Sequence, residues 1–163
     1  MGRMQMGRVA AGLSFTSLLL VFGCSGGGEN PVVFPPVPAE YADKHMPEGW
    51  WTDPKIVAEG KEIFEGRFDV DVDCSSCHGR DGKPKKRGAR DFRVGENMKH
   101  FSDSFWFWRI SEGVPHTKMK AWKTKLSEEQ RWKVMTYENT FAHNGQPFDH
   151  SKEYVPPPAA PAE

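Results

Sequence analysis

The five residues CSSCH, at positions 74–78, combine the most reactive side chains of this 163-residue chain. Cys74 and Cys77 are separated by two serines, and His78 follows directly. Thiolate and imidazole groups bind zinc, a CxxC pair can form a switchable disulfide, and CxxCH can attach a haem. The rest of the sequence must supply the features that distinguish these three chemistries.

The surroundings of the motif favour haem attachment. A closed zinc site draws four ligands, usually from two spaced pairs, and this chain has one CxxC pair. A thioredoxin-like dithiol requires a strand–helix context, whereas no long stretch here alternates with the period of a strand. Two sulfurs one helical turn apart can form thioethers with the haem vinyl groups, and the next side chain then reaches under the iron. Cys74 and Cys77 are therefore predicted to attach one covalent haem c, with His78 as the proximal iron ligand.

Three segments have the pattern of amphipathic helices. The first has Asp53 as its N-cap and Pro54 at its first position, and its apolar residues recur at three-and-four spacing up to the motif. The second covers residues 102–111 and stops at Gly113. The third covers residues 127–141 and begins with an S-x-x-Q capping box. This pattern predicts an all-α fold.

The first 23 residues have the pattern of an export signal. Arg3 and Arg8 precede an apolar run of about 14 residues, which is shorter than the roughly 20 that a membrane-spanning helix needs. The run ends in VFGC, which resembles the lipobox of bacterial lipoproteins, so Cys24 is expected to carry lipid. We therefore expect a lipid-anchored protein on the periplasmic side of a bacterial membrane. The alternative is a soluble periplasmic protein in which Cys24 stays a free thiol.

The remaining composition divides the chain into four parts. Residues 1–23 are the expected signal peptide, and residues 24–52, rich in glycine and proline, are expected to be the lipidated N-terminus and an extended tether. The haem domain is expected at residues 53–145, and residues 146–163 form a tail that is partly disordered. Lysine plus arginine equals aspartate plus glutamate at 22 each, so net charge does not indicate a nucleic-acid partner.

Over roughly residues 54–141 the chain resembles the monohaem class I c-type cytochromes. In that family an N-terminal helix carries a glycine and an aromatic residue before the motif, as Gly60 and Phe64 do here, and it crosses the C-terminal helix. Residues 134–137 fall where the family has its contacts for that crossing. The resemblance implies a small cytochrome c-like helical fold wrapped around one covalently bound haem.

The family also supplies an expectation for the proximal histidine, whose second ring nitrogen should donate to a backbone carbonyl. A proline in the loop after the motif often provides this carbonyl. Here the loop reads KPKKRGARDF, so either Pro84 is displaced or Ala89 takes the role.

The distal iron ligand has several candidates downstream, namely Met98, His100, His116, Met119, Met135 and His143. The resemblance implies Met119, because the family's segment of glycine, polar residues and methionine matches the stretch after Gly113, with His116 as the fallback. Met135 is expected in the core, and Met98 and His100 at the surface or in a loop. An open distal site is the remaining possibility.

Five apolar side chains are expected to pack against the porphyrin and keep water away from it; these are Phe107, Trp108, Ile110, Trp122 and Tyr137. Their alternative role is ordinary core packing.

The expected function is single-electron transfer between redox partner proteins, as a free carrier or a subunit of a respiratory complex, without enzymatic activity. The alternative is a haem domain that binds or senses a small ligand at an open distal site. The loop after the motif carries seven cations, Arg80, Lys83, Lys85, Lys86, Arg87, Arg90 and Arg93. These could dock an acidic partner, or form a solvated loop balanced by the nearby acids Glu65, Asp69, Asp71 and Asp73.

Overall fold

The computed structural model describes residues 1–2 and 34–157, and helices are the regular elements of this part of the chain. The α-helices are α1 (Ala39–Ala42), α2 (Pro54–Phe64), α3 (Ser75–His78), α4 (Gly95–Met98), α5 (Asp103–Glu112) and α6 (Glu128–Thr140). Three 3-10 turns accompany them, η1 (Trp50–Thr52), η2 (Phe141–His143) and η3 (His150–Lys152). The described residues contain no strand beyond an isolated bridge between Glu65 and Asp73. The predicted all-α fold is confirmed.

The three predicted helices begin at the residues whose side chains cap them. Asp53 accepts hydrogen bonds from the backbone of the first turn of α2, and Ser102 accepts one from Phe105 at the start of α5. At α6, Ser127 and Gln130 exchange both bonds of a capping box. These caps satisfy N–H groups that have no partner within their helix, so local sequence is enough to place each start.

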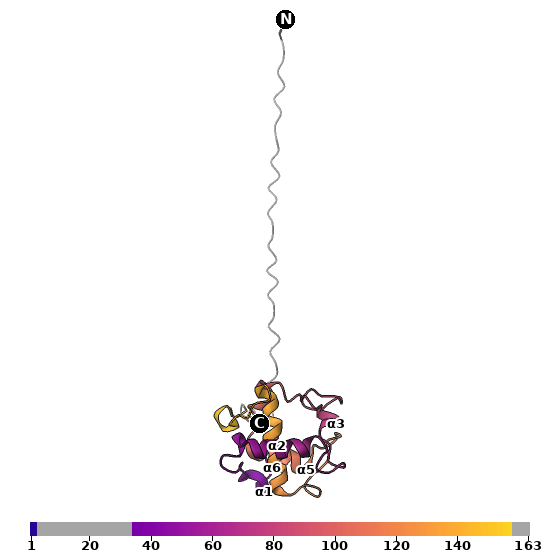
Figure 1. Cartoon of the computed structure of the whole chain (residues 1–163). Coiled ribbons are helices and arrows are strands. Elements are labelled where there is room, and N and C mark those ends of the chain that lie inside the picture. Colours follow the sequence, from indigo (N-terminus) through magenta and orange to yellow (C-terminus); the bar gives the residue numbers. More distant parts are fainter. Residues whose placement is uncertain (3–33, 158–163) are drawn as a thin grey trace. The chain divides into compact units, whose positions relative to one another are not determined.

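The helices α2 and α6 cross in close contact, and Gly60 makes this possible. A Cβ at residue 60 would lie 1.9 Å from the carbonyl oxygen of Lys133 and 3.1 Å from the Cβ of Tyr137, both on α6. Figure 1 shows the two helices crossing in the folded part of the chain. Phe64, one turn further along α2, packs against Tyr137 with their ring centroids 5.4 Å apart. The predicted helix crossing is present, with Gly60 and Phe64 in the expected positions.

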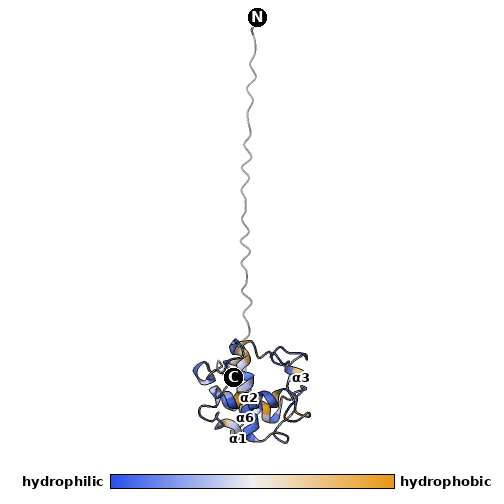
Figure 2. Cartoon of the chain, viewed as in Figure 1, coloured by the Kyte–Doolittle hydropathy of each residue, from blue (hydrophilic) through white to orange (hydrophobic). Residues whose placement is uncertain are grey.

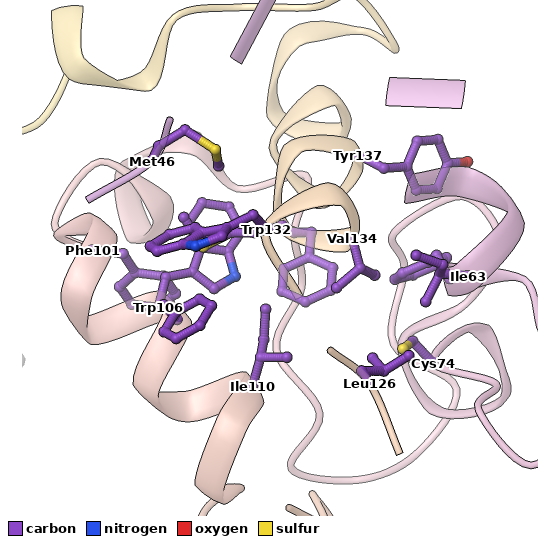
Figure 3. Packing of buried hydrophobic residues seen from close by; sticks show 14 of the residues in the cluster. Met46, Ile63, Cys74, Phe101, Trp106, Ile110, Leu126, Trp132, Val134 and Tyr137 are labelled. Carbon is purple, nitrogen blue, oxygen red and sulfur yellow. The ribbon is translucent and has the colours of Figure 1, made fainter. Parts of the chain in front are cut away.

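Buried apolar residues surround this crossing and extend to α5. Figure 2 shows both hydrophobic and hydrophilic residues on the helices, as expected for helices that bury one face. In the view of Figure 3, Met46, Phe101 and Trp106 lie on one side of α6, and Ile63 and Cys74 lie on the other. Cys74 of the haem motif is thus part of the buried cluster.

The segment before α2 is packed against the domain, which corrects the predicted tether. Tyr41, Met46 and Trp51 are buried, and the Met46 amide donates to Asp103 at 2.9 Å. Phe34 lies against Phe101 and Phe105. The domain therefore includes residues 34–52, because their aromatic side chains bury enough apolar surface to offset the loss of chain entropy. Cys24 and residues 3–23 of the predicted signal peptide lie outside the described residues.

The C-terminal boundary predicted at residue 145 is also wrong. His150 is 1% exposed, and its Nε2 donates to the carbonyl oxygen of Phe101 at 2.7 Å. The Val155 amide donates to the Lys99 carbonyl at 2.8 Å, and the Asn139 side chain donates to the carbonyl of residue 148. Residues 146–155 are thus held by the domain. Across residues 34–157, no helix combines the length and the apolar character that crossing a membrane would take.

Replacing Gly60 by alanine should destabilise the domain by about 1–3 kcal/mol, because the new methyl group has to push the α6 backbone away. Gly95→Ala is the matched control. Gly95 also lies in a helix, but a Cβ there would lie 3.9 Å from the Cβ of Ala142, which is an ordinary van der Waals contact. That variant should stay within about 0.5 kcal/mol of the parent. Denaturant unfolding of both variants measures the difference, and equal stabilities would contradict the role given to Gly60.

Candidate haem-binding site

The haem motif forms a single helical turn that Asp73 holds in place. Asp73 Oδ1 accepts from the Ser75 hydroxyl at 2.7 Å and from the Ser76 amide at 3.0 Å. The amides of Cys77 and His78 both donate to the Cys74 carbonyl. This helical turn places both sulfurs and the imidazole on one side of the segment, as attachment to a single haem requires.

His78 is 8% exposed and is fixed by two contacts. Its Nδ1 lies 3.2 Å from the carbonyl oxygen of Arg90, and its ring stacks on Phe92 with centroids 4.5 Å apart. Because a carbonyl only accepts, Nδ1 carries the proton and Nε2 keeps its lone pair. Burial lowers the pKa of His78, which favours this neutral form. The expected backbone carbonyl exists, but Arg90 provides it rather than Pro84 or Ala89.

A cavity of about 850 Å³ opens beside the motif, within the range of cofactor sites. Cys74, Cys77 and His78 line one part of it, and Met119 lines another, although 41 residues separate Met119 from His78. Apolar and aromatic side chains form much of the lining, namely Phe34, Phe92, Phe101, Phe105, Trp106, Ile110 and Trp122. The size, the thiols, the imidazole and the aromatic walls fit a porphyrin.

The loop between α5 and α6 presents Met119 to this cavity through a compact turn. The Val114 amide donates to the Met119 carbonyl at 3.1 Å, and the Met119 amide donates to the Thr117 hydroxyl at 3.1 Å. At Gly113, which has φ of 72°, a Cβ would lie 2.4 Å from the Met119 carbonyl oxygen. Glycine is therefore needed for this turn to close. Met119 is half-buried, whereas His116 is exposed at the cavity edge with φ of 60°.

The other distal candidates lie away from the cavity. Met98 is fully buried in α4, which corrects its expected surface position, and Met135 is fully buried in the core as expected. His100 contacts the Val155 carbonyl, and His143 contacts Glu153. Of the six candidates, the cavity brings only Met119 and His116 together with His78.

Two of the five side chains predicted to pack against the porphyrin line the cavity. Ile110 and Trp122 line it, as predicted. Phe107 stacks instead on Trp132 at 4.0 Å, Trp108 lies under the guanidinium of Arg109, and Tyr137 packs on the α2 side. These three side chains are not among the residues that line the described cavity, and their packing against haem stays a prediction.

The sequence analysis missed five aromatic residues that line the cavity; two come from α5 and three from segments outside the predicted helices. Phe105 and Trp106 come from α5, where Trp106 lies four residues before Ile110, so helical spacing from Ile110 could have indicated Trp106. Phe34, Phe92 and Phe101 come from segments outside the predicted helices, and no local signal marks them. Their positions follow from tertiary packing alone.

Three hydrogen-bond donors line the cavity without an ionic or polar partner among the described residues. The guanidinium of Arg90 lies 4.9 Å from the Phe101 ring centroid and that of Arg109 lies 3.8 Å from the Trp108 ring centroid. Burial lowers the pKa of both arginines. The indole Nε1 of Trp122 is buried and lacks an acceptor. Such donors fit the two carboxylates of a haem.

A carboxyl group also lines the cavity. Glu138 on α6 is 3% exposed, and its Oε2 accepts a hydrogen bond from Trp106 Nε1 at 2.8 Å. Burial raises the pKa of Glu138 to about 8, against a smaller lowering by the Trp106 bond. Sequence reasoning did not identify this residue, because a glutamate in a helix is usually exposed.

The fold and the cavity together define a c-type cytochrome domain that binds one haem c covalently. The family model described as cytochrome c oxidase, cbb3-type, subunit III matches residues 56–137, which are 82 of the 163 residues. The chain belongs to this family, whose cytochrome c domain transfers electrons through haem. The comparison with curated proteins gives no match.

Two solved structures are similar to this chain. The KustC0563 c-type cytochrome is 33% identical with a TM-score of 0.39, over 42% of this chain and 86% of that one. Cytochrome cL from the marine methylotrophic bacterium Methylophaga aminisulfidivorans is 16% identical with a TM-score of 0.49, over 84% of this chain and 88% of that one.

The raised pKa of Glu138 predicts a pH-dependent stability. In the unfolded chain this carboxyl ionises near its ordinary pKa of 4.5, whereas in the folded domain it keeps its proton up to about pH 8. The folded state therefore binds more protons in this window, and stability falls as pH rises from about 4.5 to about 8. The loss should approach about 1.4 kcal/mol per pH unit.

Glu138→Gln should remove this dependence, since glutamine can accept the same bond from Trp106 but does not ionise. Denaturant unfolding of parent and variant from pH 5 to pH 9 measures the difference in free energy of unfolding. A gap between them that does not widen with pH would contradict the burial effect.

Proposed function

We propose that this protein is a lipid-anchored periplasmic electron carrier whose haem iron is bound by His78 and Met119. It moves single electrons as a free carrier or as a subunit of a respiratory complex, and makes or breaks no substrate bond. The observation that carries the proposal is that the CxxCH residues and Met119 line one cavity.

Each of the proposed site residues has a distinct part. Cys74 and Cys77 would hold the haem through thioether bonds, and the Nε2 lone pair of His78 would bind its iron. The Arg90 carbonyl fixes the orientation of the His78 ring through Nδ1. Met119 would offer a soft, neutral thioether to the same iron. When bound, the haem supplies a one-electron couple between ferric and ferrous iron.

The cavity walls set the conditions for that couple. Aromatic side chains exclude water, and the neutral thioether of Met119 favours the ferrous state, so both raise the reduction potential relative to a solvated bis-histidine site. Arg90, Arg109 and Trp122 are the residues that would hold the haem carboxylates, because their N–H groups line the cavity without other acceptors. These contacts would orient the haem without changing its axial ligands.

Anchoring is supported by the export signal and the lipobox ending at Cys24. Phe34, where the packed segment begins, comes ten residues after the expected lipidation site Cys24. A chain of ten residues spans at most about 35 Å. The anchor would therefore keep the domain close to the membrane surface, where respiratory complexes reside.

The cationic loop supports docking of an acidic partner. Lys83, Lys85, Lys86 and Arg87 are exposed, and Lys86 and Arg87 also line the cavity. Three of the four acids that could have balanced this loop have partners elsewhere: Glu65 pairs with Arg67, Asp71 pairs with Lys125, and Asp73 caps the haem motif. A positive surface beside the haem would steer an acidic partner toward it.

Met119→Ala tests the proposed ligation. The oxidised parent should show the sulfur-to-iron charge-transfer band of methionine ligation, and the variant should lose the band and have a lower midpoint potential. His116→Ala, three residues away at the cavity edge, should keep both. Optical spectra and potentiometric titration of the purified proteins provide the measurement.

Two outcomes would overturn this ligation. Loss of the low-spin spectrum in His116→Ala, with the band absent from the parent, would assign the distal face to His116. A parent protein with a high-spin spectrum and no band would favour the alternative of an open distal site that binds a small ligand.

Charge reversal of Lys85, Lys86 and Arg87 to glutamate should slow electron transfer to an acidic acceptor at least tenfold at low ionic strength. Stopped-flow oxidation of the reduced protein by hexacyanoferrate, an anion, provides the rate, and added salt should reduce the difference. Reversal of Lys55, Lys61 and Lys152, which are exposed but do not line the cavity, is the control. Equal rates in both triple variants would argue against a docking role.

A further inference from the structure

Glu138 is a buried acid inside the proposed electron-transfer site. It is not one of the residues proposed to bind the haem or its iron. It lines the same cavity as Cys74, Cys77 and His78, and within residues 34–157 its side chain makes one hydrogen bond, which Trp106 donates. Neither His78 nor Met119 makes a hydrogen bond with it in the described structure. A carboxylate in such a place, without a cation paired to it, is costly to ionise.

Charged and titratable groups approach the Glu138 region from several elements. The motif segment contributes Asp73, Cys74 and His78, the following loop contributes Lys86, Arg87 and Arg90, and α5 contributes Arg109; the loop after α5 contributes His116, Lys118 and Lys120. The pKa of Glu138 is nevertheless governed by burial and by the Trp106 bond. Cys74 and Glu138 line the same cavity; burial raises the pKa of the Cys74 thiol, and the Glu138 charge raises it further.

We propose that Glu138 takes up a proton when the protein is reduced and releases it on oxidation, which makes this domain a proton-coupled electron carrier. The inference rests on the haem site described above. Reduction brings in one electron from the redox partner and removes one positive charge from the cavity. Glu138 then binds one proton from the solvent, and oxidation returns both.

The geometry assigns an atom to this proton. Oε2 of Glu138 accepts the Trp106 N–H bond, so the O–H bond forms at Oε1. Trp106 Nε1 can only donate, so it stabilises the carboxylate when the proton has left. Its ring lies in the buried cluster and keeps the carboxyl in one position.

The sign of the effect follows from electrostatics. Loss of a positive charge from the cavity makes the carboxylate less favourable, so the pKa of Glu138, which burial already raises, is higher in the reduced protein than in the oxidised protein. Below both pKa values the acid is protonated in both states, and the potential does not respond to it. Between the two values reduction takes up a proton, and the midpoint potential falls as pH rises.

The test is a potentiometric titration of the full-length holoprotein at several pH values from 6 to 10, compared with Glu138→Gln. The parent should show a potential that falls with rising pH in the alkaline range, approaching the about 59 mV that correspond to each tenfold change in proton concentration for one electron. Glu138→Gln should match the parent at pH 6, lie above it at pH 10, and show a flatter profile. The haem carboxylates titrate equally in both proteins, so the difference between profiles belongs to Glu138.

The matched control is Glu65→Gln. Glu65 is also largely buried, but it pairs with Arg67 and does not line the cavity. This variant should keep the parental slope. Redox-difference infrared spectra give a second readout, in which the C=O stretch of a protonated carboxyl should appear on reduction near pH 9 in the parent and be absent in Glu138→Gln.

The results separate the two proposals. A reversible one-electron couple with parallel pH profiles for parent and Glu138→Gln, and no carboxyl band, would refute the proton coupling and leave the electron carrier intact. A protein without a reversible couple would refute both. A slope lost in Glu138→Gln and kept in Glu65→Gln supports the assignment.

Discussion

The close crossing of α2 and α6 at Gly60 is the contact on which the rest of this domain depends. The Lys133 carbonyl occupies the space where any other residue would place a Cβ. The two backbones therefore approach to a distance that larger residues would prevent. The end of α2 leads into the haem motif, and α6 carries Glu138 to the cavity. One glycine thus sets how the attachment residues and the buried acid lie relative to each other.

A large cavity in a small domain reduces the packing of its core, and the segments at both ends of the domain supply additional apolar contacts. A partly open cavity of about 850 Å³ occupies a place where core side chains would otherwise pack. A domain of this size buries a limited fraction of its surface, so additional apolar contacts matter. Tyr41, Trp51 and His150 are buried from outside the predicted domain boundaries. Phe34 goes further and forms part of the cavity wall itself. The segment that precedes α2 therefore belongs to the proposed site.

The cavity combines apolar walls with charged groups that have few partners. Arg90 and Arg109 lie against aromatic faces, where cation–π contact replaces some of the water they lose. Glu138 is an acidic group in the same cavity, and burial raises its pKa so that it keeps its proton. A bound haem brings carboxylates for the donors and a changing charge for the acid. This arrangement explains why groups that are individually unfavourable occur together here.

The sequence by itself determined the local features of this protein. The CxxCH spacing identified haem attachment, and the caps at Asp53, Ser102 and Ser127 placed three helices, because these signals act over a few residues. The pairing of Gly60 with the C-terminal helix came from family resemblance. The tertiary structure alone decided which aromatic faces line the cavity, so that Trp106 lies at the site while Phe107, the next residue, stacks on Trp132. It also decided that Arg90 supplies the carbonyl for His78 and that Glu138 is buried. These outcomes depend on contacts between residues far apart in the chain, which local spacing does not encode.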